Sequence, residues 1–269
     1  MEKYLYKDLA QLEDSHWWHI SKREAVSNLM KRFYRSLRSF QNDKKLKPRI
    51  LDIGCGTGRN VIEFSKFGQV WGIDNSKEAI KFCKQKGLKN VGLGSSDKTG
   101  FGSETFDVVT LLDVLEHVEE GKTLFEIKRI LKKDGVLIIT VPAFSWLWSQ
   151  WDVVLHHKRR YTKESLAKVL LKNGFKVQKI SYMYSFLVLP VLVVRFIKSL
   201  FFKENYGSDF ELSSPVINKL FLGISRIERA VIMKYQLPVG TSLICVASLK
   251  GYSSIFLNPR SFCCSWHIF

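Results

Sequence analysis

The sequence predicts an α/β fold built on a mostly parallel sheet. Short apolar runs that stop at turn residues alternate along the chain with stretches of helical apolar spacing, the pattern of repeated strand–helix units. A glycine-rich turn at 54–58 joins one such strand to the helix after it. The chain has 269 residues, 46% of them hydrophobic, so it is long enough for one large domain with a sizeable core.

The most informative stretch is 51–58, which reads Leu-Asp-Ile-Gly-Cys-Gly-Thr-Gly. Residues 49–53 form a short buried run, and 59–67 resume an apolar helical spacing. Glycines in a strand-to-helix turn allow positive φ and a close approach of the backbone to a ligand. The helix behind them directs free N–H groups at the same place. The stretch therefore predicts a nucleotide pocket.

The glycine spacing separates two kinds of nucleotide cofactor. A dinucleotide fingerprint has glycine at its first, third and sixth positions, and the sixth position here is Arg59. With an aspartate ahead of the turn, Asp-x-Gly-x-Gly-x-Gly resembles motif I of class I S-adenosylmethionine (SAM) dependent methyltransferases; a glycine-rich turn of another kind is the alternative. The resemblance makes six residues candidates for cofactor binding: Asp52, Gly54, Cys55, Gly56, Thr57 and Gly58.

Two further segments extend the resemblance. A second apolar strand, 70–73, ends at Asp74 about twenty residues after the glycine turn, where an acid takes ribose hydroxyls. Asp74 and the next residue, Asn75, are therefore candidate cofactor contacts. Segment 105–118 resembles strand 4 of the family with its Asp-Val-Leu-Glu-His continuation, which adds Asp113 to these candidates.

The last strands complete the expected sheet. Segment 130–142 resembles the helix end, the turn and strand 5 of the same family, with Asp134 where a glycine is common. Segments 174–181 and 241–250 read as the last two strands. The resemblance covers nearly all of residues 1–250. It implies a Rossmann-like three-layer sandwich with a mostly parallel seven-stranded sheet, the last strand antiparallel, and SAM as the cofactor.

One segment departs from the family pattern. The loop after strand 3 usually carries an aspartate that meets the adenine amino group, and here it reads Gly-Ser-Ser-Asp at 94–97. By register Ser95 takes the place of that aspartate. Three alternatives remain for the adenine contact: Ser95, Asp97 after a slip of register, or the backbone alone. Without the usual aspartate, the affinity for the cofactor could be weaker.

Composition divides the chain and restricts its chemistry. We expect an N-terminal helical aromatic cap at 1–48, a SAM-binding core at 49–181, an apolar and basic helical insertion at 182–238, the last core strand at 239–250 and a tail at 251–269. The five cysteines include no Cys-x-x-Cys pair, so neither a zinc site nor a disulfide framework is predicted, and no metal site is expected. The charged first thirty residues lack a secretory signal, and a cytoplasmic location is expected.

The excess of basic residues behind the net charge of +17 lies outside residues 51–150, the part predicted to hold the cofactor. Basic against acidic residues number 12 and 6 in 1–50, 13 and 13 in 51–150, and 17 and 6 in 151–269. Such a surface attracts polyanions. The strongly apolar stretch 182–202 is interrupted by Pro190 and Arg195. It therefore indicates an interfacial helix or a buried core helix rather than a membrane-spanning helix. With the helical spacing of 216–232 it predicts a lid on the anionic face of a membrane, peripheral to the cytoplasmic side.

The N-terminal segment 13–24 contains His-Trp-Trp-His. It resembles a segment that precedes the core in a subset of the family found among enzymes of lipid-linked sugar and envelope glycoconjugate pathways. Trp17 and Trp18 are candidate substrate contacts that close over the cofactor and exclude water; packing on the first helix is the alternative.

Catalytic candidates follow strand 5, where the family builds its acceptor pocket. An oxygen acceptor must lose a proton, and an imidazole suits that task. His157 ranks first, then His156 and Tyr161, with Arg159 and Arg160 as candidates to hold a phosphate or carboxylate of the acceptor. The alternative is a solvated basic turn before a helix. His117 is expected on a helix after strand 4, in a mainly structural role.

These features predict a SAM-dependent methyltransferase whose acceptor is a lipid-linked or membrane-associated glycan or lipid. The first alternative is a soluble small metabolite or a quinone-like ring. A nucleic-acid-binding protein or RNA methyltransferase is favoured by charge alone, and because RNP, zinc-finger and base-methylation motifs are lacking, a nucleic-acid partner is not expected. A scaffold that has kept the fold without activity is the remaining class.

Overall fold

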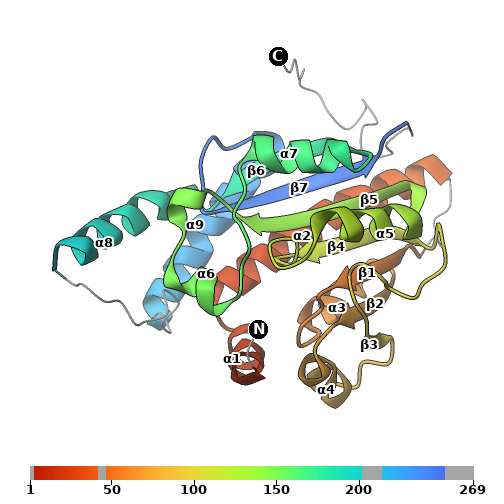
Figure 1. Ribbon diagram of the computed structural model, residues 1–269, viewed down its shortest axis with the longest axis horizontal. Coiled ribbons are helices and arrows are strands. Elements are labelled where there is room, and N and C mark those ends of the chain that lie inside the picture. The colour runs from red at the N-terminus through yellow and green to blue at the C-terminus, as the bar shows by residue number, and fades with distance from the viewer. Residues whose placement is uncertain (1–2, 42–46, 202–213, 252–269) are drawn as a thin grey trace.

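The computed structural model describes residues 3–41, 47–201 and 214–251, and these contain a seven-stranded sheet of order β3-β2-β1-β4-β5-β7-β6 (Figure 1). The strands are β1 (Arg49–Ile53), β2 (Gln69–Asp74), β3 (Val91–Leu93), β4 (Phe106–Leu112), β5 (Leu131–Pro142), β6 (Phe175–Met183) and β7 (Ser242–Leu249). β7 runs antiparallel to both β5 and β6, and the other pairs are parallel. The predicted mostly parallel sheet with an antiparallel last strand is confirmed.

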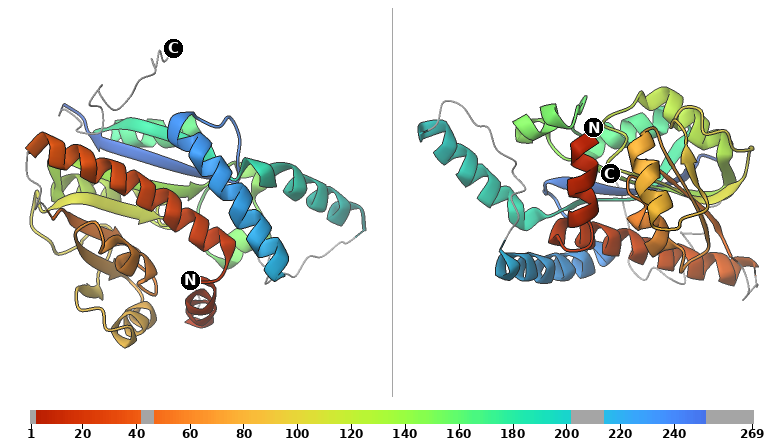
Figure 2. Two further views of the ribbon diagram at one scale, coloured as in Figure 1. Left: turned by 180° about the vertical axis from the view of Figure 1, so that it is seen from behind. Right: turned by 90° about the horizontal axis from the view of Figure 1, so that it is seen from below.

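Helices cover both faces of the sheet (Figure 2). They are α1 (Lys3–Leu12), α2 (Trp17–Gln41), α3 (Arg59–Phe64), α4 (Lys77–Gln85), α5 (Glu120–Ile130), α6 (Gln150–Val154), α7 (Lys163–Lys172), α8 (Val188–Phe201) and α9 (Pro215–Lys234), with short 3-10 turns at Ser145–Leu147 and Ser185–Leu187. Leu51 and Ile53 of β1 pack with α5 and α7, while Ile50 packs with α2, α3, α4 and α9. Because both faces are buried, the central strands read as continuous apolar runs.

Two predicted helical boundaries are wrong. The helix expected over 59–67 ends at Phe64, where Phe67 N–H closes a tight turn on the Phe64 carbonyl (2.9 Å). His117 lies in a turn, because α5 begins only at Glu120. The Glu119 carboxylate caps that helix by accepting the N–H groups of Gly121 and Lys122.

The predicted helical insertion lies between β6 and β7 and consists of α8 and α9 (Figure 1). α9 packs along α2, and Glu24 of α2 pairs with Arg226 and Arg229 of α9. α8 instead extends away from the sheet. Several of its described apolar side chains, among them Leu189 (70% exposed) and Val193, face solvent, so this part of α8 is not a buried core helix, whereas 182–184 just before it are buried. Among the described helices, none is both long and apolar enough to cross a membrane.

Candidate cofactor and acceptor site

The glycine turn between β1 and α3 is held by its own backbone. The N–H groups of Gly54 and Cys55 donate to the Ile73 carbonyl (2.8 and 3.0 Å), and the Gly58 N–H donates to the Cys55 carbonyl (2.9 Å). Gly54 has φ +74°, and a Cβ there would lie 2.4 Å from Val114. These three N–H groups are thus engaged within the protein, and a helix as short as α3 adds little. The turn serves a ligand chiefly through its shape.

Asp74 is the fixed carboxylate of this region. It ends β2, and its Oδ2 and Oδ1 accept the N–H groups of Gly56 and Ser76, each at 2.9 Å. Burial raises the pKa of Asp74, and these two hydrogen bonds oppose that effect. The carboxylate therefore has a fixed orientation beside the glycine turn, at the position where the sequence predicts a contact to ribose. Asn75, the next candidate, is exposed.

Two motif residues point into the protein. Asp52 is fully buried, accepts a hydrogen bond from the Thr110 hydroxyl (2.5 Å), and has its pKa raised to about 7 by burial. Cys55 is buried too, and a Cβ added to Gly72 would lie 3.0 Å from its sulfur. Their side chains thus support the turn from beneath rather than facing a ligand.

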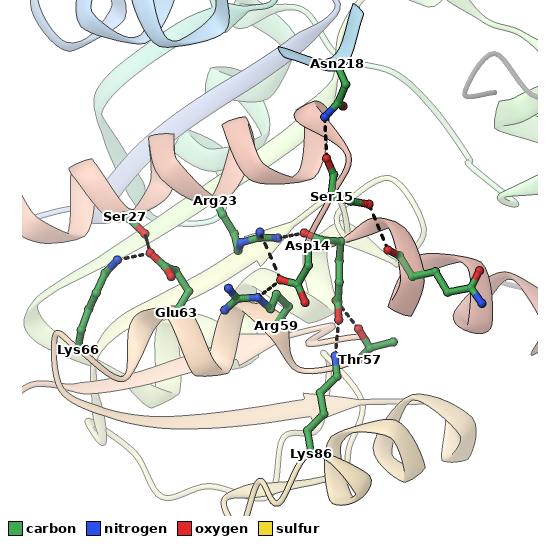
Figure 3. Close-up of polar contacts among 12 residues, drawn as sticks. Asp14, Ser15, Arg23, Ser27, Thr57, Arg59, Glu63, Lys66, Lys86 and Asn218 are labelled. Atoms are coloured by element: carbon green, nitrogen blue, oxygen red, sulfur yellow. Dashed lines mark hydrogen bonds and ion pairs between the residues drawn. The ribbon is translucent and has the colours of Figure 1, made fainter. Parts of the chain in front are cut away.

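The chain before α2 is tied onto the glycine turn (Figure 3). The buried Glu13 carboxylate contacts the Thr57 hydroxyl and pairs with Lys86. Asp14 pairs with Arg59. Thr57 was predicted as a cofactor contact, but its hydroxyl is occupied by Glu13, which the sequence did not reveal because the two residues are 44 positions apart.

Helix α1, rather than the tryptophans, lies over the glycine turn. A Cβ added to Gly56 would meet Leu9 at 3.4 Å, and the Tyr6 side chain is hydrogen-bonded to Ser76. Trp17 is buried against Tyr184 and Phe221 in edge-to-face contacts (5.5 and 5.3 Å between ring centroids), as the packing alternative expected.

Trp18 lies nearer the predicted site. The Lys22 ammonium is 3.3 Å from the centroid of its ring and forms an ion pair with Asp113 just after β4. Asp113 has φ +56° and accepts a hydrogen bond from the Thr140 hydroxyl (3.0 Å). Burial opposes its ionisation, but Lys22 outweighs burial and lowers the pKa of Asp113. Lys22 was missed because its partner is 91 positions away.

The loop after β3 is open. Ser95 and Asp97 are both exposed, and the Ser95 hydroxyl donates to the Asp97 carboxylate, which lowers the pKa of Asp97. The two candidates for adenine contact thus lie together in one exposed loop.

His157, the first-ranked catalytic candidate, belongs to a buried network. Its Nδ1 lies 2.8 Å from Asp152 Oδ1, and Arg160 grips the same carboxylate with its Nε and one terminal nitrogen (2.8 and 2.9 Å). Burial opposes ionisation of Asp152, but the hydrogen bonds from His157 and Arg160 outweigh it and lower its pKa. Arg160 also donates to the Ala143 carbonyl (3.1 Å), so its guanidinium orients Asp152 rather than awaiting an acceptor.

The other three candidates from this segment face elsewhere. The buried Tyr161 donates its hydroxyl to Glu120 (2.6 Å), and burial together with Glu120 raises its pKa, so it is a poor proton acceptor. Arg159 binds the same Glu120 carboxylate (3.2 Å) from the surface. His156 is exposed and has φ +57°.

Beside His157 lie two residues that were not predicted to belong to the site. Glu116, His117 and His157 each bring one ligand atom to within 4.8 Å of the others, a grouping able to hold a metal ion although none was predicted. Burial raises the pKa of Glu116 and lowers that of His117 to about 4. The Glu-His pair was visible in the sequence, but its distance from His157 required the fold.

Comparisons with known proteins agree with this geometry. Residues 51–139 match the methyltransferase domain family. An uncharacterized protein of Methanocaldococcus jannaschii is 28% identical over 80% of this chain and 79% of its own. A ubiquinone biosynthesis O-methyltransferase of Haemophilus ducreyi is 33% identical over 34% of this chain and 44% of its own. The matches to the first curated relatives span 39%, 45% and 65% of their lengths.

Solved structures show the same fold. A SAM-dependent methyltransferase from Archaeoglobus fulgidus superposes with a TM-score of 0.52 and 20% identity, over 84% of this chain and 94% of its own. The sheet order, the glycine turn after β1, Asp74 at the end of β2 and the matched domain all agree. Residues 51–139 of the chain are therefore a methyltransferase domain, and the chain has the fold of SAM-dependent methyltransferases, for which SAM is the cofactor.

Proposed function

We propose that this chain transfers a methyl group from SAM to a small molecule that carries a hydroxyl group, such as a phenol or quinol ring. The single observation behind this proposal is the position of two parts of the site, a cofactor half formed by the glycine turn with Asp74 and an acceptor half formed around Asp152 and His157. The locked Asp74 carboxylate and the Asp152–His157 pair both follow the carboxyl ends of parallel strands, the edge at which α/β sheets bind ligands. The O-methyltransferase of ubiquinone biosynthesis among the relatives supports an oxygen acceptor.

The cofactor half suits SAM by its own geometry. The glycine turn brings backbone close to a ligand, and Asp74, with each oxygen already holding one N–H, keeps lone pairs for two ribose hydroxyls. Bound SAM supplies an electrophilic methyl group on a positively charged sulfur, so the protein has mainly to bind and orient. Helix α1 lies over the turn and would exclude water from it.

The acceptor half would receive the hydroxyl proton. Asp152 accepts a hydrogen bond at Nδ1 of His157, which fixes the ring and leaves Nε2 directed away from that carboxylate. The buried Lys22 is already paired with Asp113, so this pair brings no net charge to the site.

The test measures release of S-adenosylhomocysteine with a panel of phenols, quinols and aliphatic alcohols. We expect turnover with at least one aromatic hydroxyl, its loss in His157→Ala, and a SAM dissociation constant within about twofold of wild type in that variant. The matched control is Lys158→Ala, an exposed neighbour, which should keep turnover. Turnover unchanged in His157→Ala would remove this residue from the reaction.

A lipid-linked acceptor is the second candidate, and one observation favours it. Helices α8 and α9 expose large apolar side chains, among them Leu189, Leu192 and Leu220, on a chain whose positive excess lies outside the cofactor half. Apolar side chains with basic surroundings are the features of helices that lie in an anionic membrane surface.

Flotation with vesicles of anionic phospholipid separates the two candidates. Peripheral binding predicts that wild type rises with the vesicles, that Leu189→Asp with Leu192→Asp stays at the bottom, and that Leu171→Asp on the exposed face of α7 still rises. A wild type that does not float at physiological salt leaves the soluble small-molecule acceptor as the function.

A further inference from the structure

Three side chains from two distant segments converge just beyond β4 and β5. Glu116 and His117 belong to the turn between β4 and α5, and His157 follows α6. One potential ligand atom of each lies within 4.8 Å of the others. The two imidazole rings stand edge to face, with 4.7 Å between their centroids and 72° between their planes.

Each imidazole already has one nitrogen engaged by the protein. His157 Nδ1 faces Asp152, and Arg160 holds that carboxylate from its other side. His117 is hydrogen-bonded to the backbone of His156. Metal-binding histidines usually hold one ring nitrogen in this way, on a carboxylate or a backbone carbonyl, which fixes the ring and leaves the other nitrogen for the ion.

Glu116 supplies a second and independent observation. Its side chain is 1% exposed, and in the part of the chain that the structure describes neither carboxylate oxygen has a hydrogen-bond partner. Buried carboxylates are almost always paired, because an unpaired one loses its hydration without compensation. Two unpartnered oxygens beside two oriented imidazoles therefore point to a missing cation.

We propose that Glu116, His117 and His157 bind one divalent transition-metal ion. Two imidazoles and one carboxylate are the ligand set of catalytic zinc sites and of sites for iron, cobalt or manganese, and they leave positions open for a further ligand. Bonds of about 2.0–2.2 Å place ligands around one ion about 3–4 Å apart, so the side chains need to close only slightly from their present spacing. Asp113 stands nearby with its charge held by Lys22.

The consequence for the reaction rests on the proposed function; the binding of the ion does not. An acceptor hydroxyl bound at an open position would lose its proton to solvent at a lower pH, as metal-bound water does. The oxygen then forms its bond to the methyl carbon while the carbon–sulfur bond breaks and its electron pair stays on sulfur. In the loaded protein His157 would be a ligand instead of the proton acceptor proposed above, and the ion would acidify the hydroxyl.

Calorimetric titration of untagged, chelator-treated full chain with Zn²⁺ tests the site, and visible absorption of bound Co²⁺ reports the ligands. We expect one ion per chain for wild type, and at least tenfold weaker binding for Glu116→Gln and for His157→Ala. The matched control is Glu119→Gln, an exposed carboxylate three residues along, which should bind as wild type does.

Each outcome decides the proposal. Absence of saturable binding, or binding that both variants leave unchanged, overturns it. SAM titration of the same samples shows that the variants are folded and tests the cofactor separately. SAM binding without ion binding therefore refutes only the metal site, whereas ion binding without any methyl transfer refutes only the proposed function.

Discussion

The cofactor half and the acceptor half of this molecule are built by different means. The glycine turn is closed by backbone hydrogen bonds, one within the turn and two to Ile73 of β2, and Asp74 fixes it from the end of the same strand. The acceptor half depends on side chains that meet across long separations, such as Lys22 with Asp113 and His117 with His157. A site that depends on backbone conformation can be recognised in the sequence by a motif of fixed spacing. A site that depends on contacts between distant side chains has almost no such motif.

The largest effect is expected from a substitution that disrupts only the acceptor half. Asp152→Ala leaves Arg160 and His157 without their buried partner, and we expect the free energy of unfolding to fall by about 3–5 kcal/mol. Urea unfolding measures this. At a temperature where the variant is folded, its SAM dissociation constant should stay within about twofold of wild type. A large loss of SAM affinity would show that the halves are not separate.

The fold could be predicted from the sequence, whereas the side-chain contacts inside the site could not. Alternating strands and helices, and an insertion before the last strand, follow from apolar spacing and turn residues. Tyr161 was predicted as a catalytic residue and Arg160 as a substrate contact. Their partners, Glu120 and Asp152, show instead that both side chains are committed within the protein.

A second prediction concerns Asp52 beneath the glycine turn. Its pKa is about 7 in the folded chain against a reference value of 3.8, so the folded state binds this proton more tightly. The resulting stability is full below about pH 4 and is lost as pH rises to about 7. Between pH 5 and 8 wild type should lose about 2–3 kcal/mol that Asp52→Asn does not. Parallel pH profiles of the unfolding free energy would refute this assignment.

The smallest expected effect concerns the loop after β3. Ser95→Ala removes one exposed hydroxyl that already bonds to Asp97, so SAM affinity should change by no more than about twofold. Asp97→Ala should weaken SAM binding several-fold if Asp97 is the adenine contact. Isothermal titration of both variants compares them, and a larger loss in Ser95→Ala would give that contact to Ser95 instead.

The central claim is that the glycine turn and Asp74 bind SAM independently of the acceptor half. Calorimetric titration with SAM of wild type, Asp74→Ala and His157→Ala tests it most directly, with Glu119→Gln as an exposed control. We predict micromolar binding in wild type and His157→Ala, and a loss of about 100-fold in Asp74→Ala, which lacks the charged acceptor for two hydroxyls. Equal SAM affinity in wild type and Asp74→Ala, or no SAM binding by wild type, would contradict the account.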